Sequence, residues 1–227
     1  MTAVPHQVAP ATHFFRGAAP DQHQARRAAT ISALAAGLSG RALDYGAGWG
    51  DLTARLAPQF TEIVGVDVDA ARVAFAALEY APIRFLQCAP EHLAFSDSEF
   101  DVVISSVVLH FVPSAEAYLA ECRRALRPGG HLVIMIQSPQ SMWMVARRWR
   151  TGALRRQSWG GSTVDEFRAW LEQAGFSVEA QAGFYDPPLD RIRNAGDIVI
   201  AVMNLFGHLL QVRRYASYVG FRCRRAP

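Results

Sequence analysis

Two aspartates and a glycine-rich turn are the residues of this chain whose types and spacing are best suited to bind a ligand. Residues 42–51 read ALDYGAGWGD, in which Asp44 ends an apolar run and small residues follow at Gly46 and Gly48. A second apolar run ends in Asp67, 21 residues after Gly46. Glycines let backbone approach a ligand closely, and the helix expected after the turn begins with N–H groups that lack intrahelical partners. A carboxylate at the tip of the next strand can accept both ribose hydroxyls. The arrangement is typical of a nucleoside-binding half-domain.

Glycine spacing and charge argue against a dinucleotide as this ligand. The glycines form G-x-G-x-G, ending at Gly50, whereas the dinucleotide fingerprint is G-x-G-x-x-G. Asp44, directly before the turn, would repel a pyrophosphate and suits a cationic ligand. S-adenosylmethionine carries a sulfonium, an α-ammonium and a ribose, and no phosphate. We therefore expect S-adenosylmethionine as the cofactor, and a nicotinamide oxidoreductase is the alternative that these residues oppose.

The turn and three later segments together resemble a known family. Residues 42–51 resemble motif I of the class I S-adenosylmethionine-dependent methyltransferases, and residues 83–112 resemble the third and fourth strands of the small-molecule methyltransferases that include the ubiquinone and menaquinone methylases. Residues 126–136 (LRPGGHLVIMI) resemble the turn and fifth strand, and residues 163–181 the next helix and sixth strand. The resemblance covers roughly residues 38–184. It implies an α/β fold: a Rossmann-like, doubly wound, seven-stranded sheet, mostly parallel with an antiparallel last strand, and with helices on both faces.

The resemblance also implies a set of cofactor contacts. Asp67 would hold the ribose of the cofactor, and Val68 would lie along its adenine. The methionine end of the cofactor would lie beside the end of the fourth strand. The family often has an acid in the loop after its third strand, where this chain has Cys88-Ala89-Pro90-Glu91. Because that acid is missing at Ala89, the backbone of Ala89 or the carboxylate of Glu91 must hold the adenine amino group. The expected cofactor-binding residues are Asp44, Tyr45, Gly46, Gly48, Asp67, Val68, Ala89, Pro90, Glu91, Ser105 and Ser106.

The chemistry expected from this cofactor is an in-line displacement at an activated methyl group. The protein therefore mainly has to align the reactants and exclude water. A base is needed only if the acceptor must lose a proton early. His110, in the VVLHFV run, is expected to open the helix after the fourth strand and is the candidate catalytic base, with a structural histidine as the alternative. Asp97, Glu99 and Asp101 form no clear ligand cluster, so no metal is expected.

Periodicity predicts the elements that must position these residues. Mostly continuous apolar runs, typical of a sheet covered on both faces, predict strands over 41–45, 62–67, 83–87, 100–106 and 131–137. The final stretch, 214–225, is also predicted to be a strand. Helices are predicted over 24–37, 50–57, 70–80, 114–126 and 163–174. The last has a capping box of Thr163 with Glu166 and stops at Gly175. Strand–helix alternation implies parallel strands with right-handed crossovers.

Length and composition predict one soluble domain. A chain of 227 residues can bury a full core without disulfides, and its three cysteines contain no C-x-x-C pair. A cytoplasmic location is therefore expected. Residues 1–22 lack the features of a signal peptide and are expected to be a flexible lead-in to a single methyltransferase domain over 23–227. The apolar run at 198–212 is too short and too polar to span a bilayer.

Two segments fall outside the minimal fold, near 138–161 and 185–213. The first contains five arginines and three tryptophans, which would form either a lid over the acceptor or a solvated helix with aromatic anchors. The second would wall an apolar pocket, contact a membrane surface, form a homodimer face or pack in the core. All 23 basic residues are arginine and 16 of them follow residue 121, so the basic half is expected to carry the acceptor site.

The expected function is transfer of a methyl group to an oxygen or carbon of a small, largely apolar metabolite, such as a quinone, polyketide, aromatic or lipid-like compound. A non-catalytic, S-adenosylmethionine-binding partner subunit is the alternative, suggested by the altered loop at Ala89. The Asp-Pro-Pro-Leu run at 186–189 resembles the tetrad of amino-group methylases, but it follows the sixth strand rather than the fourth. We interpret it as a turn and expect no nucleic-acid partner.

Overall fold

The computed structural model describes residues 22–89, 92–138, 141, 163–184, 198, 202 and 216–226. Nearly all of the predicted lead-in lies outside these residues. So do Pro90, Glu91, the Asp-Pro-Pro-Leu run and most of both predicted insertions. The division of the chain into lead-in, domain and insertions therefore stays a prediction.

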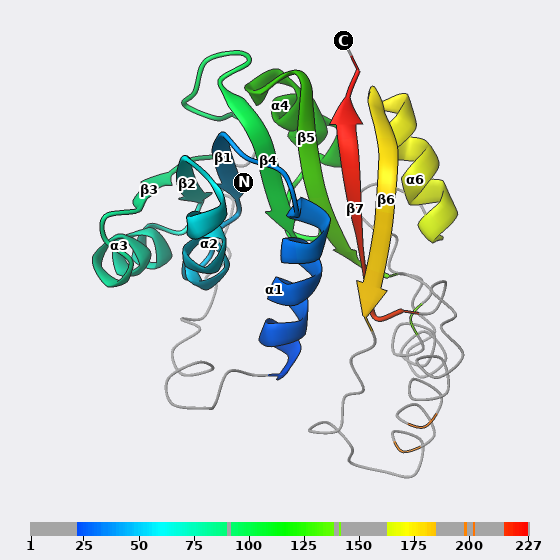
Figure 1. Ribbon diagram of the computed structural model, residues 1–227, viewed down its shortest axis with the longest axis horizontal. Helices are drawn as coiled ribbons and strands as arrows, with labels where there is room; N and C mark the ends of the chain where they lie inside the picture. Colours follow the sequence, from blue (N-terminus) through cyan, green and yellow to red (C-terminus); the bar gives the residue numbers. More distant parts are fainter. Residues whose placement is uncertain are drawn as a thin grey trace, which may run out of the picture.

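The described strands form one sheet in the order β3-β2-β1-β4-β5-β7-β6 (Figure 1). The strands are β1 (Arg41–Tyr45), β2 (Glu62–Asp67), β3 (Arg84–Gln87), β4 (Phe100–Ser106), β5 (Leu126–Gln137), β6 (Phe176–Phe184) and β7 (Tyr218–Arg225). Strands β1 to β5 pair in parallel, whereas β7 lies between β5 and β6 and runs antiparallel to both. This confirms the predicted sheet of seven strands with an antiparallel last strand.

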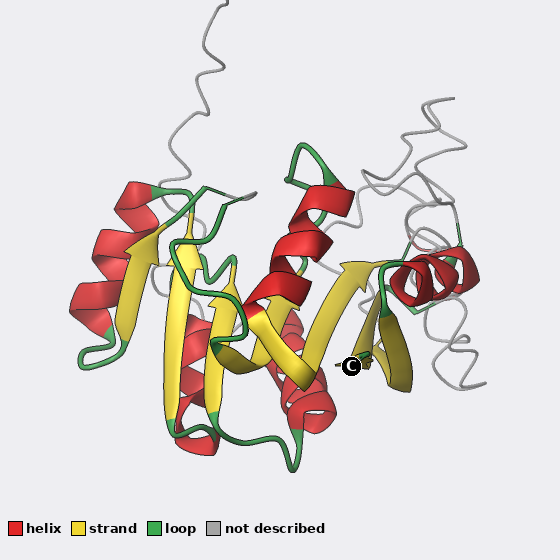
Figure 2. Ribbon diagram, turned by 90° about the horizontal axis from the view of Figure 1, so that it is seen from above, coloured by secondary structure: helices red, strands yellow, loops and turns green. Residues whose placement is uncertain are grey.

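Helices cover both faces of the sheet, as Figure 2 shows. The helices are α1 (Gln22–Ala35), α2 (Asp51–Leu56), a 3₁₀ turn η1 (Ala57–Gln59), α3 (Ala70–Glu79), α4 (Ala115–Ala125) and α6 (Val164–Gln173). None of the helices in the described part of the chain is long and apolar enough to cross a membrane.

The core has one layer on each side of the sheet. On one side, Tyr118 of α4 and Phe167 of α6 pack in a cluster with alternate residues of the central strands. On the other side, Ile31 of α1 and Leu56 of α2 belong to a second cluster. Because β4 and β5 are covered on both faces, residues 102–106 of β4 and 132–136 of β5 are all buried, which is why these segments read as continuous apolar runs.

The boundaries of most elements follow from capping residues. Thr163 and Glu166 form the predicted capping box at the start of α6, and the side chain of Asp69 caps α3 by accepting from the N–H groups of Ala71 and Arg72. The bounds of β1, β2 and β4 are those predicted.

Several predictions about the elements are wrong. Helix α1 spans Gln22–Ala35 rather than 24–37, and strand β7 begins at Tyr218 rather than at residue 214. Strand β5 begins at Leu126, not at residue 131, because Leu126 pairs with Phe100 before a register shift brings His131 opposite Val102. His110 lies in a turn and does not open a helix. Pro113 disfavours helical backbone in the residue before it, and Ser114 then caps α4 by accepting from the N–H of Ala117.

Candidate functional site

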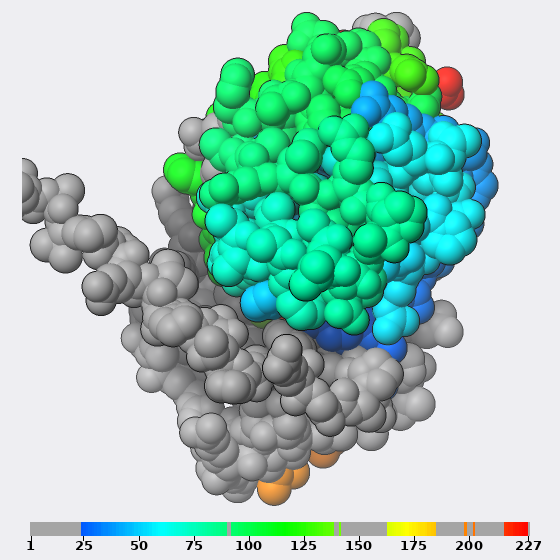
Figure 3. All heavy atoms as spheres, turned by 90° about the vertical axis from the view of Figure 1, so that its left-hand side faces the viewer, coloured from blue at the N-terminus to red at the C-terminus, as the bar shows by residue number. Residues whose placement is uncertain are grey.

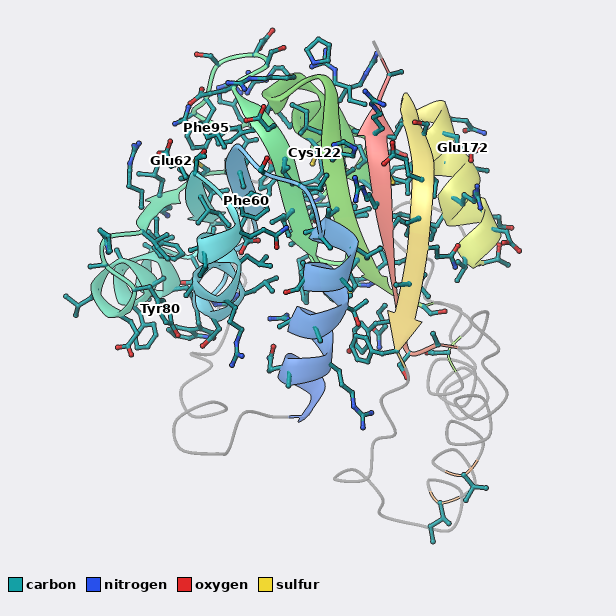
Figure 4. All side chains as sticks on the ribbon, in the orientation of Figure 1. Phe60, Glu62, Tyr80, Phe95, Cys122 and Glu172 are labelled. Carbon is teal, nitrogen blue, oxygen red and sulfur yellow. The ribbon has the colours of Figure 1, made fainter. Side chains whose placement is uncertain are left out.

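The carboxyl ends of the parallel strands meet at one edge of the sheet, the lower edge in Figure 1, and the predicted site residues converge there. Glu62, labelled in Figure 4, begins β2 at the opposite edge, so Asp67 at the other end of β2 lies on the site edge. The first turn of α1 lies on this same side of the molecule (Figure 1).

Asp44 is a buried carboxylate with only one of its two oxygens engaged. It is 1% exposed, and its Oδ2 accepts a hydrogen bond of 2.6 Å from Oγ1 of Thr53 in α2. Its Oδ1 is buried and has no hydrogen-bond partner within the described residues. Burial raises the pKa of Asp44 from its ordinary value of 3.8 to about 6, against the effects of the Thr53 bond and the charge of Arg27. The site therefore holds an unsatisfied acceptor that a cation would complete.

The backbone N–H groups of the glycine-rich turn donate hydrogen bonds to the end of β2 and so fix the turn. The N–H groups of Gly46 and Ala47 both donate to the carbonyl of Val66 over 2.8 Å, and the N–H of Gly48 donates to Oδ2 of Asp67 over 2.9 Å. Gly46 and Gly48 have φ angles of 92° and 58°, which glycine adopts at little cost. Because these amides are engaged inside the fold, they do not form the cradle that a pyrophosphate requires.

Asp67 is held in a fixed orientation at the tip of β2. While Oδ2 accepts from Gly48, Oδ1 accepts from the N–H of Asp69 over 3.0 Å, and the residue remains 9% exposed. A carboxylate has about four acceptor positions, so each oxygen retains capacity for one ribose hydroxyl. The charge of Asp67 also contributes to the raised pKa of Asp44, after burial as the main cause.

The predicted adenine side is an exposed apolar rim at the β3 edge, which faces the viewer in Figure 3. Val68 follows Asp67 and is 59% exposed. Ala89 comes just after β3, where the N–H of Cys88 donates to the carbonyl of Asp67. Trp49 of the turn packs edge-on against Phe75 of α3. Pro90 and Glu91, predicted to contact the adenine, lie outside the described residues.

The predicted methionine side lies at the end of β4. Ser106 is 8% exposed and its hydroxyl has no hydrogen-bond partner in the described part of the chain. Ser105 is fully buried and bonds to the hydroxyl of Tyr118 over 2.9 Å. The Tyr118 hydroxyl also donates to the carbonyl of Tyr45, whose ring stacks on that of Tyr118 at 4.2 Å. The side chain of Tyr45 is 3% exposed and therefore packs in the core beneath the turn.

His110 lies between β4 and α4, and one of its ring nitrogens is engaged by backbone. The N–H of Gln137, at the end of β5, donates to Nε2 of His110 over 3.1 Å. This bond requires Nε2 to carry a lone pair, so a neutral ring has its proton on Nδ1. Removal of a proton from an acceptor through Nε2 would require this bond to break.

Sequence reasoning missed a strained segment that shapes the turn. Val107, directly after β4, has a φ angle of 64°, an arrangement that costs a β-branched residue about 1–3 kcal/mol. Its N–H donates to the carbonyl of Met135 over 2.8 Å, which helps to hold it there. The next residue, Val108, lies against the turn: a Cβ added to Gly46 would come within 2.3 Å of its Cγ2. Gly46 is therefore needed both for its φ angle and for this close approach.

Thr53, Tyr118 and Arg27 were also missed. Thr53 is a fully buried polar residue between the core positions Leu52 and Leu56, and this polar interruption of an apolar helix face was the available signal. Tyr118 is separated from Tyr45 by 73 residues, so no local pattern connects them. Arg27, on α1, lowers the pKa of Asp44 by its charge.

The residues present fit S-adenosylmethionine. Oδ1 of Asp44 can accept a hydrogen bond from its ammonium, and the carboxylate of Asp67 can accept further bonds from its ribose hydroxyls. The N–H groups of Gly46, Ala47 and Gly48 already donate within the fold, which is consistent with a ligand that has no phosphate. Within 22–89, 92–138, 163–184 and 216–226, no group of three or more His, Cys, Asp or Glu side chains is arranged to hold a metal ion.

Comparison with known proteins identifies the domain. Residues 43–134 match the family model described as "Methyltransferase domain". The chain is 37% identical over 108 residues to a demethylmenaquinone methyltransferase of Beutenbergia cavernae, covering 48% of this chain and 45% of that protein. It is 29% identical over 177 residues to a ubiquinone biosynthesis O-methyltransferase of Paramagnetospirillum magneticum, covering 73% and 70%. The first four curated relatives are each matched over less than half of their own length.

The fold is shared with solved structures at lower identity. One is an S-adenosylmethionine-dependent methyltransferase of Mesorhizobium loti, with a TM-score of 0.60 and 20% identity over 86% of this chain and 95% of that one. The likeness supports the Rossmann-like architecture.

Proposed function

We propose that this chain, which belongs to the class I S-adenosylmethionine-dependent methyltransferase family, transfers a methyl group from S-adenosylmethionine to an oxygen or carbon of a small, largely apolar metabolite. The observation that carries the proposal is the pair of strand-tip carboxylates. Asp44 offers a buried oxygen without a partner within the described residues, and Asp67 keeps room for two hydroxyls. The N–H groups of Gly46, Ala47 and Gly48 in the turn donate within the fold rather than to a phosphate.

The residues of the site would bind and orient rather than react. The bound cofactor supplies a methyl group on a positively charged sulfur, which leaves as a neutral thioether when the acceptor forms its new bond to the methyl carbon. Asp44 and Asp67 would fix the two ends of the cofactor. Ser105 and Ser106 would lie beside its methionine end. The partial burial of this edge limits water at the reacting centre, and alignment of the reactants then provides most of the rate.

The acceptor class is supported by the relatives and by the rim of the site. Both named relatives are quinone-pathway methyltransferases by their descriptions, and both quinone rings and polyketides are largely apolar. Phe111, which is 82% exposed, is an apolar side chain next to His110 that such an acceptor could cover. For an acceptor with an acidic hydroxyl, we propose His110 as the base, acting after Nε2 exchanges the N–H of Gln137 for that hydroxyl.

The test is transfer of a labelled methyl group. The protein would be incubated with methyl-labelled S-adenosylmethionine and a panel of hydroquinones, phenols, polyketide-like and fatty-acyl compounds. We expect label to enter an extractable product from one class, and we expect none with an Asp67→Ala variant. Binding of the cofactor without transfer to any class would instead favour the non-catalytic partner subunit.

A further inference from the structure

Helix α3 presents an apolar face to solvent, although the outer face of a surface helix normally carries charged side chains. The inner face is formed by Ala76, which is fully buried, with Val73 half-buried beside it. On the outer face Leu78 is 86% exposed, and the other exposed apolar residues there are Ala71, Ala74, Phe75 and Ala77. A helix that is apolar on both faces is normally covered on both.

This outer face lies at one end of the sheet. Strand β3 is the edge strand, and α3 packs against β2 and β3 at that edge (Figure 2). The side of the molecule that carries α3 faces the viewer in Figure 3. Single exposed apolar residues are common on protein surfaces, whereas a continuous apolar face marks an interaction site.

The two charged residues of α3 flank this face symmetrically. Arg72 and Glu79 are two helical turns apart, so they project from the same side of the helix, and they are equally far from the midpoint between Phe75 and Ala76. Within the described part of the chain, Glu79 forms no ion pair and its side chain makes no hydrogen bond. Arg72 pairs with Asp69 over 3.5 Å, but the two side chains are 37% and 44% exposed, so this pair contributes little.

This symmetry makes the face complementary to itself. When two copies of α3 pack antiparallel about a two-fold axis through that midpoint, Arg72 lies opposite Glu79 of the partner subunit. The apolar residues then meet each other, with Leu78 near Ala74 of the partner subunit. A parallel arrangement would instead place like charges together, which is unfavourable.

We propose that α3 is the centre of a homodimer interface, in which two copies of the chain pack antiparallel through this face. A second copy is the occupant that the observations favour, because both the apolar centre and the flanking charges match under a two-fold rotation. A helix of 10 residues offers a small interface, so we expect a dimer in exchange with monomer and a Kd of about 10–100 µM. This inference goes beyond the proposed function and does not depend on it.

The experiment is sedimentation velocity of the wild-type protein and of Leu78→Glu over a concentration series that spans this Kd. We expect the wild type to shift from monomer to dimer, and Leu78→Glu to raise the Kd at least about tenfold because its charge would be buried in the interface. The urea midpoint of this variant should be unchanged, since Leu78 is 86% exposed in one copy. Phe111→Glu is the matched control: Phe111 is 82% exposed but lies outside α3, so its Kd should stay within about 2-fold.

An exchange of charges tests the antiparallel arrangement. Arg72→Glu and Glu79→Arg each place like charges opposite one another and should raise the Kd by about 3- to 10-fold, whereas the double variant should return it to within about 2-fold of the wild type. A wild type that stays monomeric would overturn the proposal and leave the face to a partner of another sequence. A dimer that Leu78→Glu does not weaken would place the interface elsewhere, and a double variant that is not restored would exclude the antiparallel pairing.

Discussion

The Thr53 hydroxyl donates to Oδ2 of Asp44 over 2.6 Å, and this bond leaves Oδ1 of the same buried carboxylate without a partner. One oxygen is thus fixed by the protein, and the other has an unused capacity to accept a hydrogen bond. The arrangement holds an ionisable group in a position that is unfavourable without a cation, which is typical of binding sites that gain affinity from preorganised charge.

Cofactor affinity should depend on pH through Asp44. Its pKa is raised to about 6 by burial, so below this pH the carboxyl is increasingly protonated and cannot pair with an ammonium. We expect the Kd for S-adenosylhomocysteine to rise by up to about tenfold per pH unit as pH falls below 6, and to be flat above 7. Calorimetry in buffers of different ionisation enthalpy should detect proton release at pH 5. Asp44→Asn should bind weakly with no such slope, and a slope retained in this variant would contradict the assignment.

The same group should make the ligand-free protein less stable as pH rises. A carboxyl whose pKa is higher in the folded than in the unfolded state contributes stability that is complete below pH 3.8 and is lost as pH rises through about 6. The loss is of the order of 3 kcal/mol. The free energy of unfolding of Asp44→Asn, minus that of the wild type, should therefore increase between pH 4 and pH 7 in urea titrations. A difference that does not change with pH would mean that Asp44 is not buried as described.

The two glycines of the turn should differ sharply when replaced by alanine. In Gly46→Ala, the new Cβ would come within 2.3 Å of Val108, in addition to the strain of a positive φ angle. Gly48→Ala meets nothing within 4 Å and has only the φ strain. We expect a loss of unfolding free energy of about 2–4 kcal/mol for Gly46→Ala and about 1 kcal/mol for Gly48→Ala, measured by urea denaturation. Similar losses in both variants would be evidence against the contact with Val108.

Local pattern was sufficient to predict much of this fold. The apolar runs that contain Asp44 and Asp67 near their ends predicted the bounds of β1 and β2. This is because a strand covered on both faces consists of consecutive apolar residues. The start of β5 was missed because Leu126 is held in the sheet by pairing with Phe100, 26 residues earlier. Neither the strand propensity of this segment nor the helix-breaking Pro128 indicates that pairing.

The bond network beneath the turn should be structural. The Tyr118 hydroxyl joins the carbonyl of Tyr45 to the hydroxyl of Ser105, and all three side chains are buried. In Tyr118→Phe, the two partners would lose this bond away from water, so we expect the free energy of unfolding to fall by about 1–3 kcal/mol. Ser105→Ala removes only one arm and should cost less. If Tyr118→Phe unfolds at the wild-type urea concentration, the network has no net effect on stability.

The hydrogen bond between the Gln137 N–H and His110 allows a structural role of His110 to be distinguished from a role as the base. His110→Ala removes the acceptor of the Gln137 N–H and should lower the free energy of unfolding by about 1 kcal/mol, whereas His110→Gln offers a carbonyl and should restore most of it. If His110 also serves as the base, transfer to a phenolic acceptor should fall by about 10²- to 10⁴-fold in both variants. Full activity of His110→Gln on such an acceptor would leave His110 with the positioning role only.

The parts of the site that were missed in the sequence are those made across the fold. Asp44 and Asp67 could be found because each ends an apolar run. The partner of Asp44 on α2, the charge contributed by Arg27 from α1, and the approach of Val108 to Gly46 depend on how helices and loops pack over the sheet edge. A single sequence contains no local pattern for such contacts.

The most direct test of the account is a calorimetric titration of the wild-type protein with S-adenosylhomocysteine and, in parallel, with NAD. S-adenosylhomocysteine keeps the ribose and the ammonium that the site is proposed to hold. We predict saturable binding of this ligand and none of NAD, because Asp44 and the engaged amides of the turn oppose a pyrophosphate. Binding of NAD, or of neither ligand, would contradict the central claim that the two strand-tip carboxylates form a site for S-adenosylmethionine.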